Sequence, residues 1–492
     1  MNDRRRVDLR SIAWTAMGKY GFEPAFPKTV MQEVNSMHER AFTGISGDVR
    51  DLRSLLWSSI DNADSMDLDQ LEYCERSTGG EIQVKVAIAD VDSYVAKHSP
   101  TDRHAEQNGT SVYTGIETFP MLPDKLSRGI TSLLPGHDRM AIIIEFTVLP
   151  DGSFRKGDLC KALVLNKAKL IYEEIGDWLE GKSPVPPAVS GVPGLEEQLR
   201  LQNEASEILR RHRREEGALE LNTIEANPVV EGDVVRDLVI QRQNLARCLI
   251  EEFMVAANGT MVAFLGRHNL PMIQRVVRTP EYWDEIVAVA SSHGERLPSE
   301  PDAKALAKFL TRQQEKDPER FPDLSLTIVK LLGPGEYMML DPREPPTGHF
   351  SLAVVDYTHA TAPNRRYVDI INQRLAKSVL DHEPDPYSRD ELARLADWLT
   401  AREKASKKVK RYMRKAVAAV LLHDRIGQVF EALVTGAKES GTFVRLIAPP
   451  AEGRVVRGDK GLKVGQKIRV RLLKTDPYNG YIDFERIGGM PQ

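Results

Sequence analysis

The hydrophobic pattern of the first 50 residues predicts helices. Asp8 can cap a helix that runs to about Lys19, and Pro27 suits the first turn of a second helix through Val34. Two short helices joined by a turn are typical of a helix-turn-helix and also of an arm that packs on a larger domain. Both interpretations stay open for residues 1–50, and packing is the commoner use of such a pair.

Strands are predicted in the next part of the chain. Residues 82–91 alternate between apolar and polar and then become wholly apolar, which is typical of a half-buried strand that enters a core. Residues 140–146 form a second predicted strand, and the turn sequence at 150–152 should lead into a third. The stretch 181–194 is rich in Pro, Ser and Gly and is predicted to be a surface loop.

Helical periodicity returns in the second half. An apolar residue recurs at every fourth position from Leu245 to Met261, which predicts a buried helix face, and Asp237 is expected to cap this helix. Residues 333–348 are dense in Gly and Pro and are predicted to be a loop. Further helices are predicted over residues 282–292, 303–313, 364–380 and 391–422.

Short alternating strands separated by glycines follow from about Gly427. About five strands in the last 60 or so residues predict a small barrel of the OB type. Phe443 and Tyr481 could stack on bases from its surface, or they could belong to its core. We expect at least one of the two to be exposed. The clearest strands are at 429–434, 442–447, 467–473 and 481–484.

Composition sets limits on function. The chain has 492 residues, 41% hydrophobic and 28% charged, which leaves room for two to four globular domains. Its formal net charge of −4 means that any surface for nucleic acid must be a local one. Three distant cysteines make zinc and disulfides poor candidates. With no run of 18 apolar residues and no signal-like start, we expect a cytoplasmic protein without a membrane partner.

One local basic surface is evident between residues 402 and 415. Eight lysines and arginines fall in this window, opposed only by Glu403. A run of this kind is often a solvated helix face, but its density also suits contact with phosphates. Both interpretations stay open. The window contains Arg402, Lys404, Lys407, Lys408, Lys410, Arg411, Arg414 and Lys415.

Residues 60–70 carry the strongest chemical signal, because they hold four aspartates and no Lys or Arg. Crowded carboxylates repel one another, and a bound cation would remove that repulsion. Carboxylate oxygens suit Mg²⁺ or Mn²⁺. An EF-hand is excluded, since Ala63 and Met66 stand where that loop needs an oxygen ligand and a glycine. A solvated acidic loop is the plain alternative. The aspartates are Asp61, Asp64, Asp67 and Asp69.

A series of motifs, found in the same order, resembles those of the ribonuclease II family with its RNB domain. About nine-tenths of the chain is covered, ending in an OB-fold RNA-binding domain of the kind repeated in ribosomal protein S-one. The resemblance implies an α+β multidomain fold, with a mixed sheet and surrounding helices in the catalytic domain. A small helical domain before it is expected from the pattern of residues 1–50, in place of the cold-shock domains that the family often carries there. Within it, 167–174 should be a helix. The motifs lie at 60–70, 87–91, 110–127, 167–174, 250–258 and 357–367.

The resemblance also implies domain limits and an activity. We expect a helical arm over 1–50, the RNB catalytic domain over 51–422 and the OB-fold over 423–492. The family's activity is processive 3′–5′ hydrolysis of RNA to nucleoside 5′-monophosphates. The expected partner is RNA, single-stranded or with a 3′ overhang, and no obligate protein partner is evident. The expected cofactor is Mg²⁺, with Mn²⁺ as the alternative, in a two-metal mechanism.

Site residues follow from the family's motifs by position. The metal ligands would be Asp61, Asp67, Asp69 and Gln70, and the catalytic residues Asp67, Asp69 and Arg365. Tyr113 matches a tyrosine that stacks on the RNA 3′ end, and Tyr172 one that lines the channel. Glu251 and Glu252 match an acidic pair that contacts a ribose 2′-OH, and Arg366 is a further substrate contact. His104, His349, His359, Asp90 and Asp92 are expected to be structural.

Three departures from the family pattern matter. Gln70 stands where the family has a fourth aspartate, and it brings no charge. Residues 218–221 contain no aromatic where a second stacking ring is expected. A glutamate expected in the helix after the arginine motif falls in the run 407–410 and is a lysine. The alternative function is therefore an RNA-binding protein with an RNB fold and no catalysis.

Overall fold

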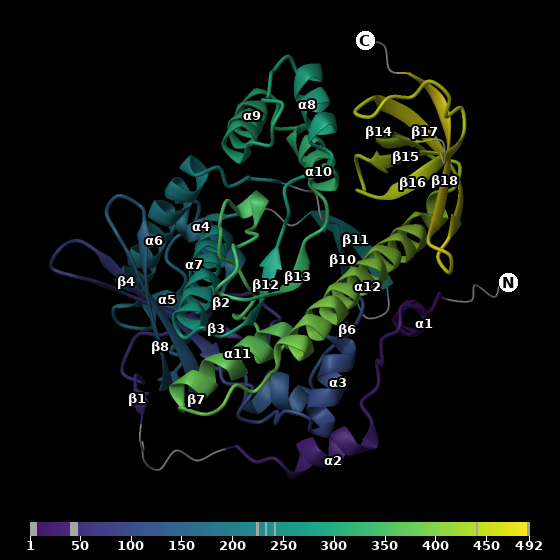
Figure 1. The fold of residues 1–492 in the computed structure, drawn as a ribbon. Coiled ribbons are helices and arrows are strands. Elements are labelled where there is room, and N and C mark those ends of the chain that lie inside the picture. Colours follow the sequence, from purple (N-terminus) through teal and green to yellow (C-terminus); the bar gives the residue numbers. More distant parts are fainter. Residues whose placement is uncertain are drawn as a thin grey trace.

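A seven-stranded mixed sheet is the centre of the structure (Figure 1). The computed structural model describes residues 7–39, 48–222, 226–231, 234–240, 243–438 and 441–489. The sheet has the order β1-β8-β7-β4-β3-β2-β9; its inner strands are antiparallel, and β1 and β9 join the edges in parallel. The strands are β1 Val49–Asp51, β2 Ser58–Asp61, β3 Gln70–Arg76, β4 Ile82–Ala89, β7 Asp138–Val148, β8 Phe154–Leu165 and β9 Ala168–Ile171.

The predicted strands are confirmed, and two predictions beside them are wrong. β4 and β7 cover the two alternating stretches, and the turn after β7 leads into β8 as expected. The loop predicted over 181–194 contains a short helix, α5 Pro187–Ser190, because Pro187 opens a turn that Val189 anchors in the core. Residues 167–174 are not one helix: β9 extends the sheet before α4 Tyr172–Leu179 begins.

The long buried helix is α7, Leu245–Arg267, and its predicted cap is wrong. Asn244 caps α7 by accepting the backbone N–H of Arg247 at 2.9 Å. Asp237 lies instead in a hairpin of β10 Ala226–Glu231 and β11 Val234–Ile240, which separates it from α7. Among the described residues α7 is the single helix long and apolar enough to cross a membrane, but 78% of its most apolar window is buried against protein.

A separate helical unit packs around its own hydrophobic cluster. α8 Trp283–Ser292 and α9 Ala303–Lys316 confirm two predicted helices, and α10 Phe321–Leu332 completes the unit. The loop predicted over 333–348 is partly wrong. β13 Glu336–Leu340 lies within it and pairs with β12 Met272–Val276, so tertiary pairing overrides the Gly and Pro content.

A 34-residue helix, α12 Arg389–Leu422, connects the sheet region to a closed five-stranded barrel (Figure 1). This confirms the predicted long helix and the small barrel. Phe443 and Tyr481 are both exposed, at 36% and 62%. The barrel strands are β14 Val429–Lys438, β15 Gly441–Leu446, β16 Glu452–Arg457, β17 Lys467–Asp476 and β18 Tyr481–Gly489.

The N-terminal helices match their predicted limits and pack on different elements. α1 Leu9–Lys19 is capped by Asp8 and packs on α12, beside the barrel. α2 Lys28–Ser36 packs on α3 Pro100–Asn108 instead. Because the two helices do not form one compact pair, their arrangement is that of a packing arm laid along the larger domain.

A buried ion-pair network fixes α11, Tyr367–Leu380, against the sheet region. Arg374 is 4% exposed and pairs with Asp92 and Asp102, each at 2.7 Å. Lys377 pairs with Asp90 at 2.9 Å and with Asp92 at 3.0 Å. Asp90 and Asp92 are thus structural, as expected. The network matters for the site because α11 directly follows the arginine motif.

We predict that Arg374→Met lowers the free energy of unfolding by about 3–5 kcal/mol, because it leaves buried carboxylates without their cation. Urea denaturation followed by circular dichroism measures this. Arg155→Met is the matched control, since Arg155 is 60% exposed in its pair with Glu81, and we expect a change within about 0.5 kcal/mol. Equal midpoints for the two variants would contradict the prediction.

Candidate active site around the aspartate cluster

The aspartates of residues 60–70 gather where two neighbouring strands of the sheet meet. Asp61 is the last residue of β2, and Asp69 directly precedes β3. The intervening loop carries Asp64, which is exposed, and Asp67, which is half-buried. Gln70 opens β3 and is 8% exposed. The fold therefore brings the four proposed ligand positions to one end of β2 and β3.

Asp69 is the most constrained member of the cluster, at 2% exposure. One carboxylate oxygen accepts the backbone N–H of Asn364 at 2.9 Å, and the other accepts Nε–H of Arg365 at 3.2 Å. Burial raises the pKa of Asp69 to about 7, against the opposing charge of Arg365. The aspartate motif and the arginine motif, almost 300 residues apart in sequence, therefore meet in one ion pair.

Asp67 is held by the tyrosine of β5, Val112–Tyr113. The hydroxyl of Tyr113 donates to Asp67 at 2.8 Å. Burial and the charge of Asp67 raise the pKa of Tyr113, so its phenol stays neutral and serves as a donor. The ring itself is 37% exposed, which leaves it accessible to a ligand.

Asp61 and Tyr172 lie together at the parallel ends of β2 and β9. Asp61 accepts the backbone N–H of Asn62 at 2.8 Å and the hydroxyl of Ser65 at 2.7 Å. Burial raises the pKa of Asp61, and burial together with Asp61's charge raises that of Tyr172. The guanidinium of Arg247 lies 4.3 Å from the centre of the Tyr172 ring. Sequence reasoning missed Arg247, because nothing in the α7 pattern marks it.

The loop that carries Arg365 is fixed by its neighbour. Arg366 makes two hydrogen bonds to Asp369, at 2.8 and 2.7 Å, and Asp369 also accepts the backbone N–H of Ala362 at 2.7 Å. The Asn364 side chain accepts from the hydroxyl of Thr131 at 2.6 Å. These contacts leave Arg365 as the arginine that faces the aspartates, with Arg366 turned into the fold.

The acidic pair on α7 is divided between two environments. Glu252 is 3% exposed and receives two hydrogen bonds from Arg213, at 2.7 and 2.5 Å. Glu251 is half-exposed and accepts from Gln243 at 3.2 Å. Both line a cavity of about 180 Å³, whose wall includes residues 218–222. Of the pair, Glu251 is therefore the carboxylate that a ligand can reach.

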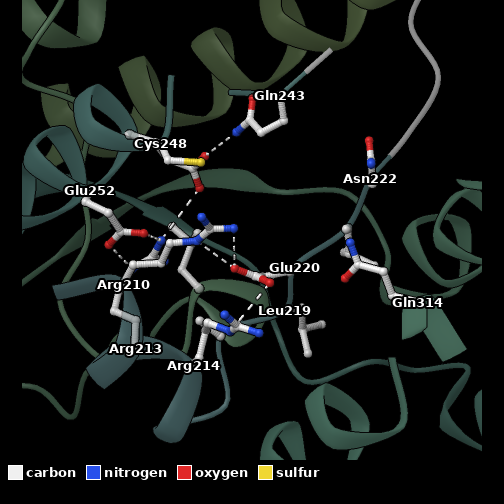
Figure 2. A pocket seen from close by; sticks show the side chains of 14 residues that line it. Arg210, Arg213, Arg214, Leu219, Glu220, Asn222, Gln243, Cys248, Glu252 and Gln314 are labelled. Atoms are coloured by element: carbon white, nitrogen blue, oxygen red, sulfur yellow. Dashed lines mark hydrogen bonds and ion pairs between the residues drawn. The ribbon is translucent and has the colours of Figure 1, made fainter. Parts of the chain in front are cut away.

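Arginines from α6, Leu195–Glu215, complete this cavity and were not anticipated. Arg210 pairs with Glu220 at 2.7 Å, and Arg214 approaches the same carboxylate at 3.5 Å (Figure 2). The expected position of a second stacking ring is occupied by Leu219 and Leu221, which line the cavity. These arginines could not be anticipated from the sequence pattern, because α6 itself was not predicted.

The expected structural histidines are held within the protein. His359 accepts or donates a 2.8 Å hydrogen bond with the Tyr337 hydroxyl, and burial lowers the pKa of His359. Burial also lowers the pKa of His349, to about 4. Nε2 of His104 lies 3.1 Å from Nδ2 of Asn108, within hydrogen-bonding distance. All three are neutral near pH 7, as expected of structural residues.

The donor chemistry of the cluster fits a hard divalent cation. All four proposed ligand positions offer carboxylate or amide oxygens. In the described part of the chain, no three His, Cys, Asp or Glu side chains converge closely enough to hold a metal ion. Asp67 is turned to Tyr113 and Asp69 to Arg365, which satisfies the two carboxylates separately. A cation would have to draw them together.

Comparisons with known proteins agree with this architecture. The RNB domain profile matches residues 49–382, and that of the RNase II-type exonuclease C-terminal S1 domain matches 428–487. Ribonuclease R of Escherichia coli is 30% identical over 86% of this chain and 52% of its own length. Ribonuclease R 1 of Lactococcus lactis is 27% identical, over 94% and 59%. The chain thus spans between half and three-fifths of these relatives.

Solved structures share the fold. RNase R of Mycoplasma genitalium, in complex with ribose methylated single-stranded RNA, has a TM-score of 0.88 at 22% identity, over 98% of this chain and 78% of that one. Yeast Ssd1, described as a pseudonuclease, has a TM-score of 0.65 at 16% identity, over 87% and 53%. The resemblance drawn from the motifs is confirmed: the chain belongs to the RNB-domain family and carries the C-terminal S1 domain of RNase II-type exonucleases.

Proposed function

We propose that the chain is a 3′–5′ exoribonuclease that hydrolyses single-stranded RNA to nucleoside 5′-monophosphates. The observation that carries this proposal is the ion pair between Asp69 and Arg365, at 3.2 Å. A guanidinium that could bind phosphate, beside carboxylates that could hold a cation, is the combination that phosphodiester hydrolysis needs. Family membership and relatives named Ribonuclease R support the same reaction.

Asp61, Asp67, Asp69 and Gln70 would hold Mg²⁺, with Mn²⁺ as the alternative. Bound there, divalent cations polarise the phosphoryl oxygens and make water nucleophilic near neutral pH. Gln70 supplies an amide oxygen and no charge, so the site offers a cation one negative charge fewer than four aspartates would. Of the proposed ligands, Asp69 would be stabilised most by a bound cation, because its carboxylate is the most deeply buried.

Arg365 would bind the scissile phosphate. Its side chain is 42% exposed although one nitrogen contacts Asp69, so the guanidinium can reach a ligand. A guanidinium offers paired donors that match a phosphate, and it offsets the charge that develops during hydrolysis. Arg366 would act differently from a direct substrate contact. Its ion pair with Asp369 shapes the loop that aims Arg365.

Tyr113 and Glu251 would hold the 3′ end without reading its sequence. The exposed ring of Tyr113 can stack on a base, since every base has a π-face. Glu251 can accept a hydrogen bond from a ribose 2′-OH, which distinguishes RNA from DNA. Glu252 would support this contact indirectly, because its pair with Arg213 anchors the start of α7. Tyr172 would line the path of the RNA.

The second candidate function is RNA binding without hydrolysis. The observation in its favour is Gln70, which removes one metal-binding charge from the cluster. The likeness to yeast Ssd1, described as a pseudonuclease, adds to it. Both candidates need an RNA-binding channel, so only a cleavage assay separates them.

We expect the chain to shorten a 5′-labelled single-stranded RNA of about 30 nucleotides from its 3′ end. The ladder on a denaturing gel should need Mg²⁺ or Mn²⁺ and disappear with EDTA. Asp69→Asn and Arg365→Ala should each lower the rate by about 10²- to 10³-fold, because each removes a charged group at the reacting phosphate.

Asp64→Asn is the matched control, since Asp64 is exposed and stands outside the four ligand positions. It should keep the wild-type rate. RNA that stays intact in every lane, while a gel shift still reports binding, would overturn the exoribonuclease in favour of the non-catalytic binder.

Magnesium affinity should fall on acidification. Because burial raises the pKa of Asp69 to about 7, a proton and a cation compete for this carboxylate. Below that pH, each unit should cost about tenfold in apparent affinity, and above it the affinity should level off. Calorimetric titration of the metal-free protein with Mg²⁺ measures this. Asp69→Asn should bind weakly and without this pH dependence.

The raised pKa of Asp69 also predicts the direction in which the free energy of unfolding changes with pH. The folded protein binds this proton more tightly than the unfolded chain, so the stabilisation is present at low pH and is lost as pH rises through about 7. Added Mg²⁺ should restore the lost stabilisation at the higher pH.

For the prediction on metal affinity, an Mg²⁺ affinity that stays constant as the pH passes through about 7 would show that Asp69 is not a ligand.

Glu251→Gln should lower kcat/KM for RNA by about tenfold, because the amide accepts a 2′-OH hydrogen bond more weakly than a carboxylate. A single 2′-deoxy substitution at the contacted nucleotide should cost the wild type a similar factor and the variant nothing further. Glu252→Gln is the comparison. It should lower thermal stability, since it weakens the buried pair with Arg213. Full additivity of Glu251→Gln and 2′-deoxy losses would contradict the contact.

A further inference from the structure

One lysine of the basic helix α12 lies against the proposed 3′-end site. The Lys410 ammonium is 5.7 Å from the centre of the Tyr113 ring. Lys410 is half-buried, whereas Lys404, Lys407 and Lys408 on the same helix are exposed. The helix also packs on β5, which carries Tyr113. This position is therefore set by the fold, and it differs from that of the solvated lysines around it.

Tyr113 contacts one negatively charged side chain and one positively charged side chain. Its hydroxyl donates to Asp67, and its face is covered by the Lys410 ammonium. A cation over an aromatic face is attracted by the ring, which holds both groups in place. An RNA end that stacks on the exposed part of Tyr113 would bring its phosphates close to Lys410. Arg365 is also near, since its charge acts on the Tyr113 phenol.

The chain departs from the family pattern in two ways that bear on its grip on RNA. Within the run 407–410, which includes Lys410, a lysine stands where the pattern has a glutamate, so a negative charge is replaced by a positive one. Residues 218–221 supply Leu219 and Leu221 where a second stacking ring is expected. The first change strengthens attraction for phosphate, and the second weakens stacking. The two changes act in opposite directions on the grip on RNA.

We propose that Lys410 binds a phosphate of the 3′-terminal nucleotides, and that this charge contact replaces the grip of the missing aromatic. Lys410 is then a specificity-determining residue of the 3′-end site. The proposal rests on the proposed function, because it needs RNA to enter with its 3′ end at Tyr113. If Lys410 binds phosphate, the affinity for RNA should depend strongly on salt, since ion pairs with phosphate weaken as salt rises and stacking weakens much less.

The test measures binding and needs no cleavage. Fluorescence anisotropy would follow a 5′-labelled RNA of about six nucleotides on the full chain in EDTA, between about 50 and 200 mM salt. Lys410→Gln should weaken binding by about five- to tenfold at the lower salt and reduce the salt slope by about one. Lys410→Glu should weaken it further, and Lys410→Arg should keep most of the affinity.

Lys408→Gln is the matched control. It removes the same charge from an exposed position about 200° around the helix, so a short RNA at Tyr113 should not reach it. The Tyr113→Ala background separates a direct contact from support of the ring. If Lys410 binds phosphate, Lys410→Gln should still weaken binding there. If it only orients Tyr113, the effect should vanish.

Three results would overturn the inference. They are unchanged affinity in Lys410→Gln, an equal loss in Lys408→Gln, and a loss that disappears in the Tyr113→Ala background. Each of these still requires RNA binding by the wild type, so the proposed function survives them. Wild-type protein that neither binds nor shortens RNA would instead refute the proposed function, and the inference with it.

Discussion

The cost of burying carboxylates away from water, to which their mutual repulsion adds, is the constraint on which this site depends. Asp69 is almost fully buried, and the charges of Asp67 and Asp369 add to the effect of burial in raising its pKa, while Asp67 acts in the same way on Asp61. The protein meets this cost with a side-chain donor for each group: Arg365 for Asp69, Tyr113 for Asp67 and Ser65 for Asp61. Two of these donors, Arg365 and Tyr113, are also proposed to contact RNA. The charge that must be balanced thus positions residues that are proposed to bind substrate.

The rest of the fold holds these donors rigidly. Arg365 belongs to a loop with no regular structure, yet the Arg366–Asp369 pair and the Thr131–Asn364 hydrogen bond fix it on both sides. The ion pairs of Arg374 then attach the following helix, α11, to the sheet region. A loop that must meet a buried aspartate 296 residues away needs such support, because small displacements of a charged catalytic group cost much activity.

Local pattern predicted the elements, and long-range pairing limited that prediction. The limits of α1 and β4 follow from a cap and from alternation, which are properties of neighbouring residues. β13 and the β10–β11 hairpin were missed because their partners decide them, and Asp237 was assigned to the wrong element for that reason. The aspartate and arginine motifs were recognisable, since their residue types carry the chemistry. Arg213, Arg247 and the division of Glu251 from Glu252 were not, because they depend on packing between helices.

Two departures from the family pattern change the charge of the site with the same sign. Gln70 removes a negative charge among the proposed metal ligands, and the run 407–410, which includes Lys410 beside Tyr113, has a lysine where a glutamate is expected. Both changes make the site more positive, which weakens attraction for a cation and strengthens attraction for phosphate. RNA phosphates brought in by Lys410 and Arg365 would themselves supply negative charge to a metal. Binding of RNA and of metal should therefore support each other more strongly here than in a site with four aspartates.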